Sequence, residues 1–216
     1  MKIYNSLGPN PRALRMMLLE KQLSFPMERV DLLGAENRTG EYASRNPGAQ
    51  LPALELDDGT LICETVPVME YIEDTHPVIP LIGSDAREKA ECRMWVRRVE
   101  LKITEHIYCA FRYGPGLEMY RERQPVFPDM FEGLKAQVQV GIDWLEPLLD
   151  GKHYLCGDRF TIADIILYAA LDFGQGIEIP GTLPPNLQSW FERIGTHSST
   201  AASTDDEGAA AGFRGV

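Results

Sequence analysis

A carboxylate and a hydroxyl stand side by side at positions 64 and 65, directly before an apolar run that predicts a helix. Glu64 and Thr65 follow two short predicted strands that are joined by a tight turn at 57–59. The free N–H groups at the start of a helix attract an anion, and a carboxylate accepts hydrogen bonds from an ammonium group. This arrangement therefore suits a small peptide that carries both a free amine and a free carboxylate.

The dipeptide Leu51-Pro52 leads the first of these strands. An X-Pro bond tolerates the cis form, and a fixed kink at the entry of a strand exposes main-chain groups. From the residues alone, an ordinary trans proline at a strand edge is an equally good interpretation. Thr65 is open to a second interpretation as well, because a threonine at this place can serve only to cap the helix.

The elements that position these residues follow from local patterns in the first third of the chain. Asn is a good N-cap and Pro is favoured at the first helical position, so Asn10-Pro11 predicts the start of a helix. The predicted order is a strand at 2–5, this helix, a strand at 25–32, a loop with a short helix at 34–48, and then the hairpin and helix described above. This order is typical of a thioredoxin-like α/β domain, which we assign to residues 1–77.

The chain from 86 to 195 has the patterns of an all-helical domain. Apolar residues recur every three or four positions over 92–107 and again over 131–149, and each pattern predicts one long helix. Thr161 and Asp164 form a capping box ahead of another apolar run. The expected fold class is therefore an α/β thioredoxin-like domain followed by an all-α domain.

Two segments fall outside these domains. Residues 78–85 are predicted to be a linker, because prolines at 77 and 80 interrupt any regular element there. From residue 196 the chain consists mostly of Ser, Thr, Ala, Gly and Asp with little apolar content, which predicts a disordered tail at 196–216.

Composition excludes several classes of function. The formal net charge of −11 argues against a nucleic-acid partner, which would favour a basic surface. The four cysteines lie far apart without a C-x-x-C pair, and the four histidines are equally scattered, so we expect free thiols in a reducing compartment and no metal. No signal peptide and no apolar run of membrane-spanning length is visible, so a soluble cytoplasmic protein without a membrane partner is expected.

Taken together, the motifs resemble those of the cytosolic glutathione transferase family over residues 1–195. The resemblance rests on three motifs in this order and spacing: Gln50-Leu51-Pro52, Glu64-Thr65 and the segment 157–164. Within the family, the segments 6–12 and 54–60 look most similar to the yeast type-2 transferases and their bacterial relatives. The resemblance implies the glutathione transferase fold, glutathione as co-substrate, no metal, and a homodimer.

The resemblance also implies how glutathione binds. Pro52 would be cis, so that Leu51 offers its backbone N–H and C=O to the cysteinyl part. Glu64 and Thr65 would hold the γ-glutamyl end, and Gln50 would add a polar contact nearby.

The glycyl carboxylate of glutathione needs a basic partner, which several family members place just before the proline motif. Here that place is occupied by residues 47–49, Pro-Gly-Ala. The candidates are therefore Arg38 and Arg45, although each is also a plausible solvated loop arginine.

Catalysis by this family requires a lower pKa of the glutathione thiol, because the thiolate is the nucleophile. The segment after the first strand has no cysteine, and Ser6 is its one hydroxyl. Serine is a common turn residue, and Ser6 lies early in the segment. The alternative is the N-terminus of the first helix, framed by Asn10, Pro11 and Arg12, where free backbone donors and the helix dipole favour an anion.

The yeast-type relatives also place a histidine near the end of the long helix, where a water contacts the sulfur. Tyr113 aligns with that histidine, and tyrosine can hydrogen-bond a thiolate or its water. The wall of the electrophile pocket is predicted from a group of side chains on either side of this point, although core packing is an equally good interpretation: Tyr108, Phe111, Arg112 and Met119.

The leading functional hypothesis is a transferase that joins glutathione to a small hydrophobic electrophile, with a role in detoxification. A glutathione-dependent lyase, isomerase or dehalogenase acting on one metabolite is a narrower alternative. A third hypothesis is a non-enzymatic binding or regulatory protein that kept the fold.

Overall fold

The computed structural model describes residues 1–205, 208, 210 and 214–216. Its N-terminal part holds a four-stranded sheet in the order β2-β1-β3-β4. The strands are β1 (Lys2–Asn5), β2 (Met27–Arg29), β3 (Ala53–Glu55) and β4 (Leu61–Cys63). β1 pairs with β2 in parallel, and the other pairs are antiparallel. The predicted strand at 25–32 is thus real but shorter.

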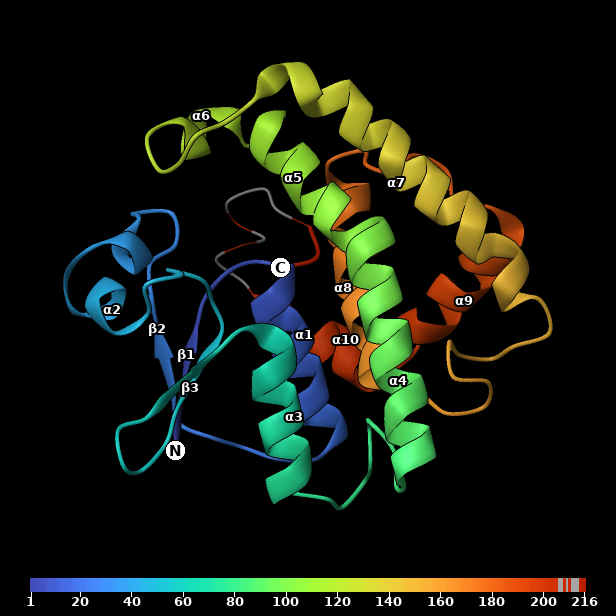
Figure 1. Cartoon of the computed structure of the whole chain (residues 1–216), viewed down its shortest axis with the longest axis horizontal. Coiled ribbons are helices and arrows are strands. Elements are labelled where there is room, and N and C mark those ends of the chain that lie inside the picture. The colour runs from blue at the N-terminus through green and yellow to red at the C-terminus, as the bar shows by residue number, and fades with distance from the viewer. Residues whose placement is uncertain (206–207, 209, 211–213) are drawn as a thin grey trace.

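Helices pack around this sheet as in a thioredoxin-like domain, which confirms the prediction. They are α1 (Pro9–Glu20), the 3-10 turn η1 (Glu36–Arg38), α2 (Gly40–Arg45) and α3 (Thr65–Thr75). Figure 1 shows α1 and α3 between the sheet and the rest of the molecule, with α2 beyond the opposite side of the sheet.

The second part is all-helical in the described residues, as the sequence predicts. Its elements are α4 (Ala86–Val99), η2 (Glu100–Thr104), α5 (Glu105–Tyr113), α6 (Leu117–Arg121), η3 (Pro128–Met130), α7 (Phe131–Leu145), η4 (Glu146–Leu149), α8 (Ile162–Gly176), α9 (Pro185–Gly195) and α10 (Ser198–Ala202). The predicted capping box is confirmed. The Thr161 side chain accepts a hydrogen bond from the Asp164 backbone N–H, and the Asp164 side chain accepts one from the Thr161 backbone N–H. In the described part of the chain, no helix is both long and apolar enough to cross a membrane.

One departure from the predicted long helix lies between α4 and α5. Residues 100–104 form a π-helical turn, so the helix continues but holds its hydrogen bonds five residues apart there instead of four. Such a turn adds a residue to the helix and changes which side chains face inward. Here Glu100, Thr104 and Tyr108 follow one another at four-residue spacing along one side of the helix.

A single hydrophobic core joins the two parts. It contains Ile3 and Leu14 from the first domain together with Leu171 and Trp190 from the second. α1 packs directly on α8. The two domains therefore share their apolar interior.

A buried ion pair fixes the connection between the domains. Lys21 donates to Glu73 at 2.7 Å and to the carbonyl oxygens of residues 78 and 79. The other carboxylate oxygen of Glu73 accepts the N–H groups of residues 81 and 82. Both side chains are almost completely buried, so this pair ties α1 and α3 to the linker.

The segment after residue 196 differs from the predicted disordered tail. Residues 198–202 form α10, in which Ser199 and Thr200 are buried. Polar contacts hold the segment: Arg12 donates to the Thr200 carbonyl, and Arg15 donates to the Ser203 carbonyl. Low apolar content therefore misled the prediction, because main-chain acceptors rather than side-chain packing anchor this region. The tail residues 206–207, 209 and 211–213 lie outside the described residues.

Candidate functional site

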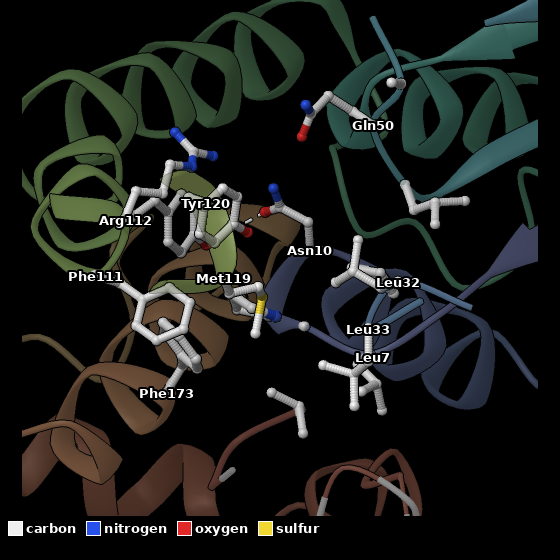
Figure 2. A pocket seen from close by; sticks show the side chains of 17 residues that line it. Leu7, Asn10, Leu32, Leu33, Gln50, Phe111, Arg112, Met119, Tyr120 and Phe173 are labelled. Atoms are coloured by element: carbon white, nitrogen blue, oxygen red, sulfur yellow. Dashed lines mark hydrogen bonds between the residues drawn. The ribbon is translucent and has the colours of Figure 1, made fainter. Parts of the chain in front are cut away.

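A cavity opens between the two domains, and we call it the apolar cavity. The hollow, with the part open to solvent, measures about 750 Å³. The first domain contributes residues 7–11, 32–33 and 49–51, and the helical domain contributes mainly aromatic side chains. Figure 2 shows Leu7, Leu32, Leu33, Met119, Phe111 and Phe173 around it.

All four side chains predicted to form a pocket wall line this cavity: Tyr108, Phe111, Arg112 and Met119. Phe111 packs edge-to-face against Phe173 at 5.0 Å and against Tyr120 at 6.0 Å between ring centroids. This row of three rings gives the cavity a rigid aromatic side.

A second hollow lies next to the first, and we call it the acidic hollow. Its lining includes Glu64 and Thr65 from the start of α3, and Glu100, Thr104 and Glu105 from the region of the π-helical turn. Asn10 and Tyr108 line both hollows. These two residues therefore mark the boundary between an apolar and an acidic compartment.

The start of α3 presents unpaired donors to the acidic hollow. Glu64 occupies the cap position with a φ of 73°, a left-handed conformation that costs energy in a residue other than glycine. Thr65 is the first helical residue, and its side chain makes no capping bond, so it is not simply a cap. The N–H groups of Thr65 and Val66 have no partner among the described residues, as expected for the first turn of a helix.

The start of α1 offers fewer main-chain donors than most helices. Pro9 and Pro11 have no N–H, which leaves the Asn10 N–H as the free donor of these three positions. The Tyr108 hydroxyl donates to the side-chain oxygen of Asn10 at 3.2 Å, marked by the dashed line in Figure 2. Burial raises the pKa of Tyr108 above its ordinary range, so the phenol keeps its proton and its donor role. The NH₂ group of Asn10 is consequently left to donate to a bound molecule.

The Leu51-Pro52 peptide bond is cis, which confirms the prediction. The carbonyl of Gln50 accepts from Tyr42 at 2.6 Å and from Asn46 at 2.8 Å, which fixes the segment before the proline. No described residue hydrogen-bonds the N–H or C=O of Leu51. Leu51 lines the apolar cavity and can therefore offer both main-chain groups to a ligand there.

Three of the predicted catalytic residues are not brought to either hollow. Ser6 is fully buried and donates to the Val30 carbonyl at 2.6 Å. Arg12, predicted to frame the N-terminus of the first helix, is 1% exposed and pairs with Asp172 of α8 at 2.6 Å. Tyr113 packs against Phe127. Each of these side chains already has a structural partner, and residue type alone did not reveal it.

The two arginines proposed for the glycyl carboxylate are also engaged elsewhere. Arg38 donates to the carbonyl of Arg123 at 3.0 Å and to Gln124 at 3.3 Å. Arg45 donates to Tyr4 at 2.8 Å and to Glu55 at 3.1 Å. Neither arginine lines the two hollows.

Three residues of the acidic hollow were not predicted from the sequence: Glu100, Thr104 and Glu105. Burial raises the pKa of Glu100, and the negative charge of Glu105 adds to the effect, while Arg97 opposes it. Thr104 is 1% exposed, and its hydroxyl has no hydrogen-bond partner in the described part of the chain. A hollow with three carboxylates and a free hydroxyl stabilises an ammonium group. The four-residue spacing of Glu100, Thr104 and Tyr108 could have indicated that they share one side of the helix. The apolar residues at helical spacing in the same segment dominated the pattern instead.

Replacing Glu100 by glutamine is expected to raise the free energy of unfolding at pH 7. Because its folded pKa is raised, the folded protein keeps a proton that the unfolded chain releases above its ordinary pKa of 4.5, so stability falls as pH rises. Glutamine lacks this penalty. Thermal unfolding of both proteins between pH 3.5 and 7 checks the sign. The difference in free energy of unfolding between the two proteins should shrink toward zero below the unfolded pKa of Glu100. A difference that does not depend on pH would contradict the raised pKa.

No group of three metal-ligating side chains occurs among residues 1–205 and the few described positions after them. The cysteines described are all free thiols. The site is therefore built from backbone donors, an amide, carboxylates and aromatic rings.

Comparison with known proteins shows to which family the chain belongs. The family model for the glutathione S-transferase N-terminal domain matches residues 8–75, and the model for the C-terminal domain matches residues 108–197. The chain is 30% identical over 206 residues to glutathione S-transferase 2 of Saccharomyces cerevisiae, which covers 90% of this chain and 85% of that protein. The chain belongs to the glutathione S-transferase family.

A solved structure and one further relative show how far the similarity extends. The crystal structure of Gtt2 from Saccharomyces cerevisiae matches with a TM-score of 0.85 at 28% identity, covering 94% of this chain and 100% of that chain. A protein described as a probable maleylacetoacetate isomerase of Caenorhabditis elegans is 30% identical over 167 residues, covering 74% of this chain and 73% of that protein. The family thus joins a shared fold and glutathione chemistry to more than one reaction.

Proposed function

We propose that this protein is a glutathione transferase that joins the glutathione thiolate to a small hydrophobic electrophile. The observation that carries the proposal is the position of Asn10 and Tyr108, which line both hollows at once. One compartment suits a charged amino-acid end and the other suits an apolar molecule. The reacting sulfur belongs at the boundary between them.

In this proposal the γ-glutamyl end of glutathione occupies the acidic hollow. Its carboxylate accepts from the free N–H groups of Thr65 and Val66 and from the Thr65 hydroxyl, while the α3 dipole favours the negative charge. Its ammonium group lies among Glu64, Glu100 and Glu105. The cysteinyl part pairs with the backbone of Leu51, and Gln50 adds a polar contact.

The thiolate is stabilised at the start of α1 in this proposal. A helix N-terminus contributes about 0.3–1 kcal/mol, and about 2 kcal/mol when partly buried. A hydrogen bond from Asn10 to a charged sulfur adds about 1.5–3 kcal/mol. Since one pKa unit corresponds to about 1.4 kcal/mol, the two effects together can lower the thiol pKa by one to three units, roughly. No hydroxyl from Ser6 is required.

The reaction is a displacement or an addition at carbon. The sulfur forms a C–S bond with the electrophilic carbon. In a displacement the bond to the leaving group breaks and a halide or similar anion departs; in an addition the π bond of the electrophile breaks and its other carbon takes up a proton from solvent. The aromatic row and Met119 hold the apolar body of the electrophile. As the family resemblance implies, the protein would act in the cytoplasm as a homodimer in detoxification.

A glutathione-dependent isomerase is the second candidate. It is favoured by the identity of 30% with the protein described as a probable maleylacetoacetate isomerase. The same thiolate would then add to a double bond of one metabolite and leave again after rotation. A lyase or dehalogenase, and a regulatory protein that only binds glutathione, stay as further alternatives.

Retention on immobilised glutathione, followed by conjugation of chlorodinitrobenzene, tests the proposal. Glu64→Gln and Thr65→Val are each expected to weaken glutathione binding about 10- to 100-fold, because each removes a hydrogen bond to a charged group. Thr75→Val is the matched control at the other end of α3, where the hydroxyl bonds a helix carbonyl. Unchanged affinity in both site variants would disprove the site assignment, and binding without turnover of any electrophile would favour the regulatory protein.

A further inference from the structure

Arg112 places a guanidinium group in the apolar cavity, whose lining also includes Val216, the last residue of the sequence. Among the described residues that line the apolar cavity, Arg112 has the one ionised side chain. Its Nη1 lies 3.9 Å from the sulfur of Cys109, and its guanidinium lies over the ring of Tyr120 at 5.9 Å. No carboxylate of the described residues pairs with it. The arginines at 12, 38 and 45, by contrast, are each bound to oxygen acceptors.

A guanidinium in this position favours an anionic ligand. It presents a rigid fork of donors that matches a carboxylate with two parallel hydrogen bonds, and it lies within cation–π distance of the Tyr120 ring. The net charge of −11 repels anions from the protein as a whole, so a local cation is needed to select one.

The place of Arg112 in the cavity indicates which molecule carries the anion. Arg112 follows Tyr108 by one turn of α5 and adjoins Phe111 in the aromatic row, so it belongs to the wall that faces the electrophile. Figure 2 shows its guanidinium and the Gln50 amide reaching toward the same end of the cavity, away from Phe111 and Phe173. Apart from the polar contact of Gln50, the contacts assigned to glutathione come from Leu51, the start of α3 and the acidic hollow.

We propose that the preferred electrophile is a small aromatic or unsaturated carboxylic acid, whose carboxylate binds Arg112 while its apolar body lies against the aromatic row. This inference rests on the proposed function and specifies its substrate class.

The test compares a chloronitrobenzoate with its methyl ester as electrophiles. We expect wild type to prefer the acid in kcat/KM, and Arg112→Gln to reduce the ratio of acid to ester about 10- to 100-fold, as for a charge-assisted pair. Arg112→Lys should keep part of the ratio, because it keeps the charge but loses the fork. The control is Arg121→Gln on α6, whose side chain pairs with Glu118 at the surface and should leave the ratio unchanged.

A second arm asks whether Arg112 instead binds the glycyl carboxylate of glutathione. Each protein is assayed with glutathione and with its glycyl ethyl ester. If Arg112→Gln abolishes discrimination between these two thiols while the acid-to-ester ratio of the electrophile stays constant, the inference is overturned. An acid-to-ester ratio of kcat/KM that is already near one for the wild-type protein also overturns the inference.

Calorimetric binding of the two glutathione conjugates, acid and methyl ester, separates this inference from the proposed function. Tight binding of both conjugates without preference would refute the role of Arg112 and leave glutathione binding intact. Absence of binding by either conjugate and by glutathione itself would refute the proposed function, and this inference with it.

Discussion

Glu73→Ala is expected to lower the free energy of unfolding by about 3–5 kcal/mol, the usual cost of leaving a buried charge without its partner. The carboxylate binds Lys21 on one side and two main-chain N–H groups of the linker on the other. Alanine leaves the ammonium group buried and both N–H groups unpaired, and each such group costs about 1–3 kcal/mol. Equilibrium unfolding in urea, followed by tryptophan fluorescence, measures the change.

Glu70→Ala is the matched control on the same helix. Glu70 pairs with Arg93 of α4 at 2.6 Å, but both side chains are substantially exposed. Exposed pairs contribute about 0–1 kcal/mol, so this variant should be close to wild type. Equal losses in the two variants would mean that the linker is not held by the Lys21–Glu73 pair.

Asn10→Ala is expected to reduce kcat/KM for conjugation about 10- to 100-fold. The variant removes the side-chain donor at the boundary between the two hollows, and a hydrogen bond to a charged group contributes about 1.5–3 kcal/mol. The pKa of the bound glutathione thiol should rise by about one to two units. Ultraviolet absorbance of the bound thiolate across pH measures this shift directly.

Tyr108→Phe distinguishes the effect of the Asn10 amide itself from the effect of holding that amide in one orientation. The phenyl ring keeps the packing, but the hydroxyl that holds the Asn10 side chain is lost. We expect a smaller pKa rise in the same direction, whereas the surface variant Gln139→Ala should behave as wild type. A thiol pKa unaffected by Asn10→Ala would remove the amide from the mechanism. Loss of turnover in Ser6→Ala with glutathione binding intact would transfer the role to Ser6.

Much of this fold was predictable because its signals are local. Asn10-Pro11 predicted α1 to within two residues, and the Thr161–Asp164 box marks the start of α8. The box depends on hydrogen bonds within one turn of α8, whereas the predicted capping role of Asn10 is wrong: α1 begins at Pro9 after Gly8 and has no side-chain cap. The cis bond before Pro52 came from the family motif, since its own sequence is compatible with either isomer.

What the sequence could not supply was the partner of each polar side chain. Ser6 and Arg12 have types suited to catalysis, but Val30 and Asp172, which bind them, are distant in the chain. The anchoring of residues 198–203 has the same origin, because its acceptors are main-chain carbonyls that carry no residue signature. Long-range polar pairing is decided by the assembled fold.

The π-helical turn at 100–104 makes the chemistry of the cleft sensitive to chain length. A π turn takes up one more residue than an α-helical turn does, so its presence helps to set the direction of the side chains that follow it. A change in the length of the turn would therefore redirect the side chains of Tyr108 and Arg112, although neither residue is substituted. A change of one residue in the length of this turn is therefore expected to alter the lining of both hollows without any substitution among the lining residues.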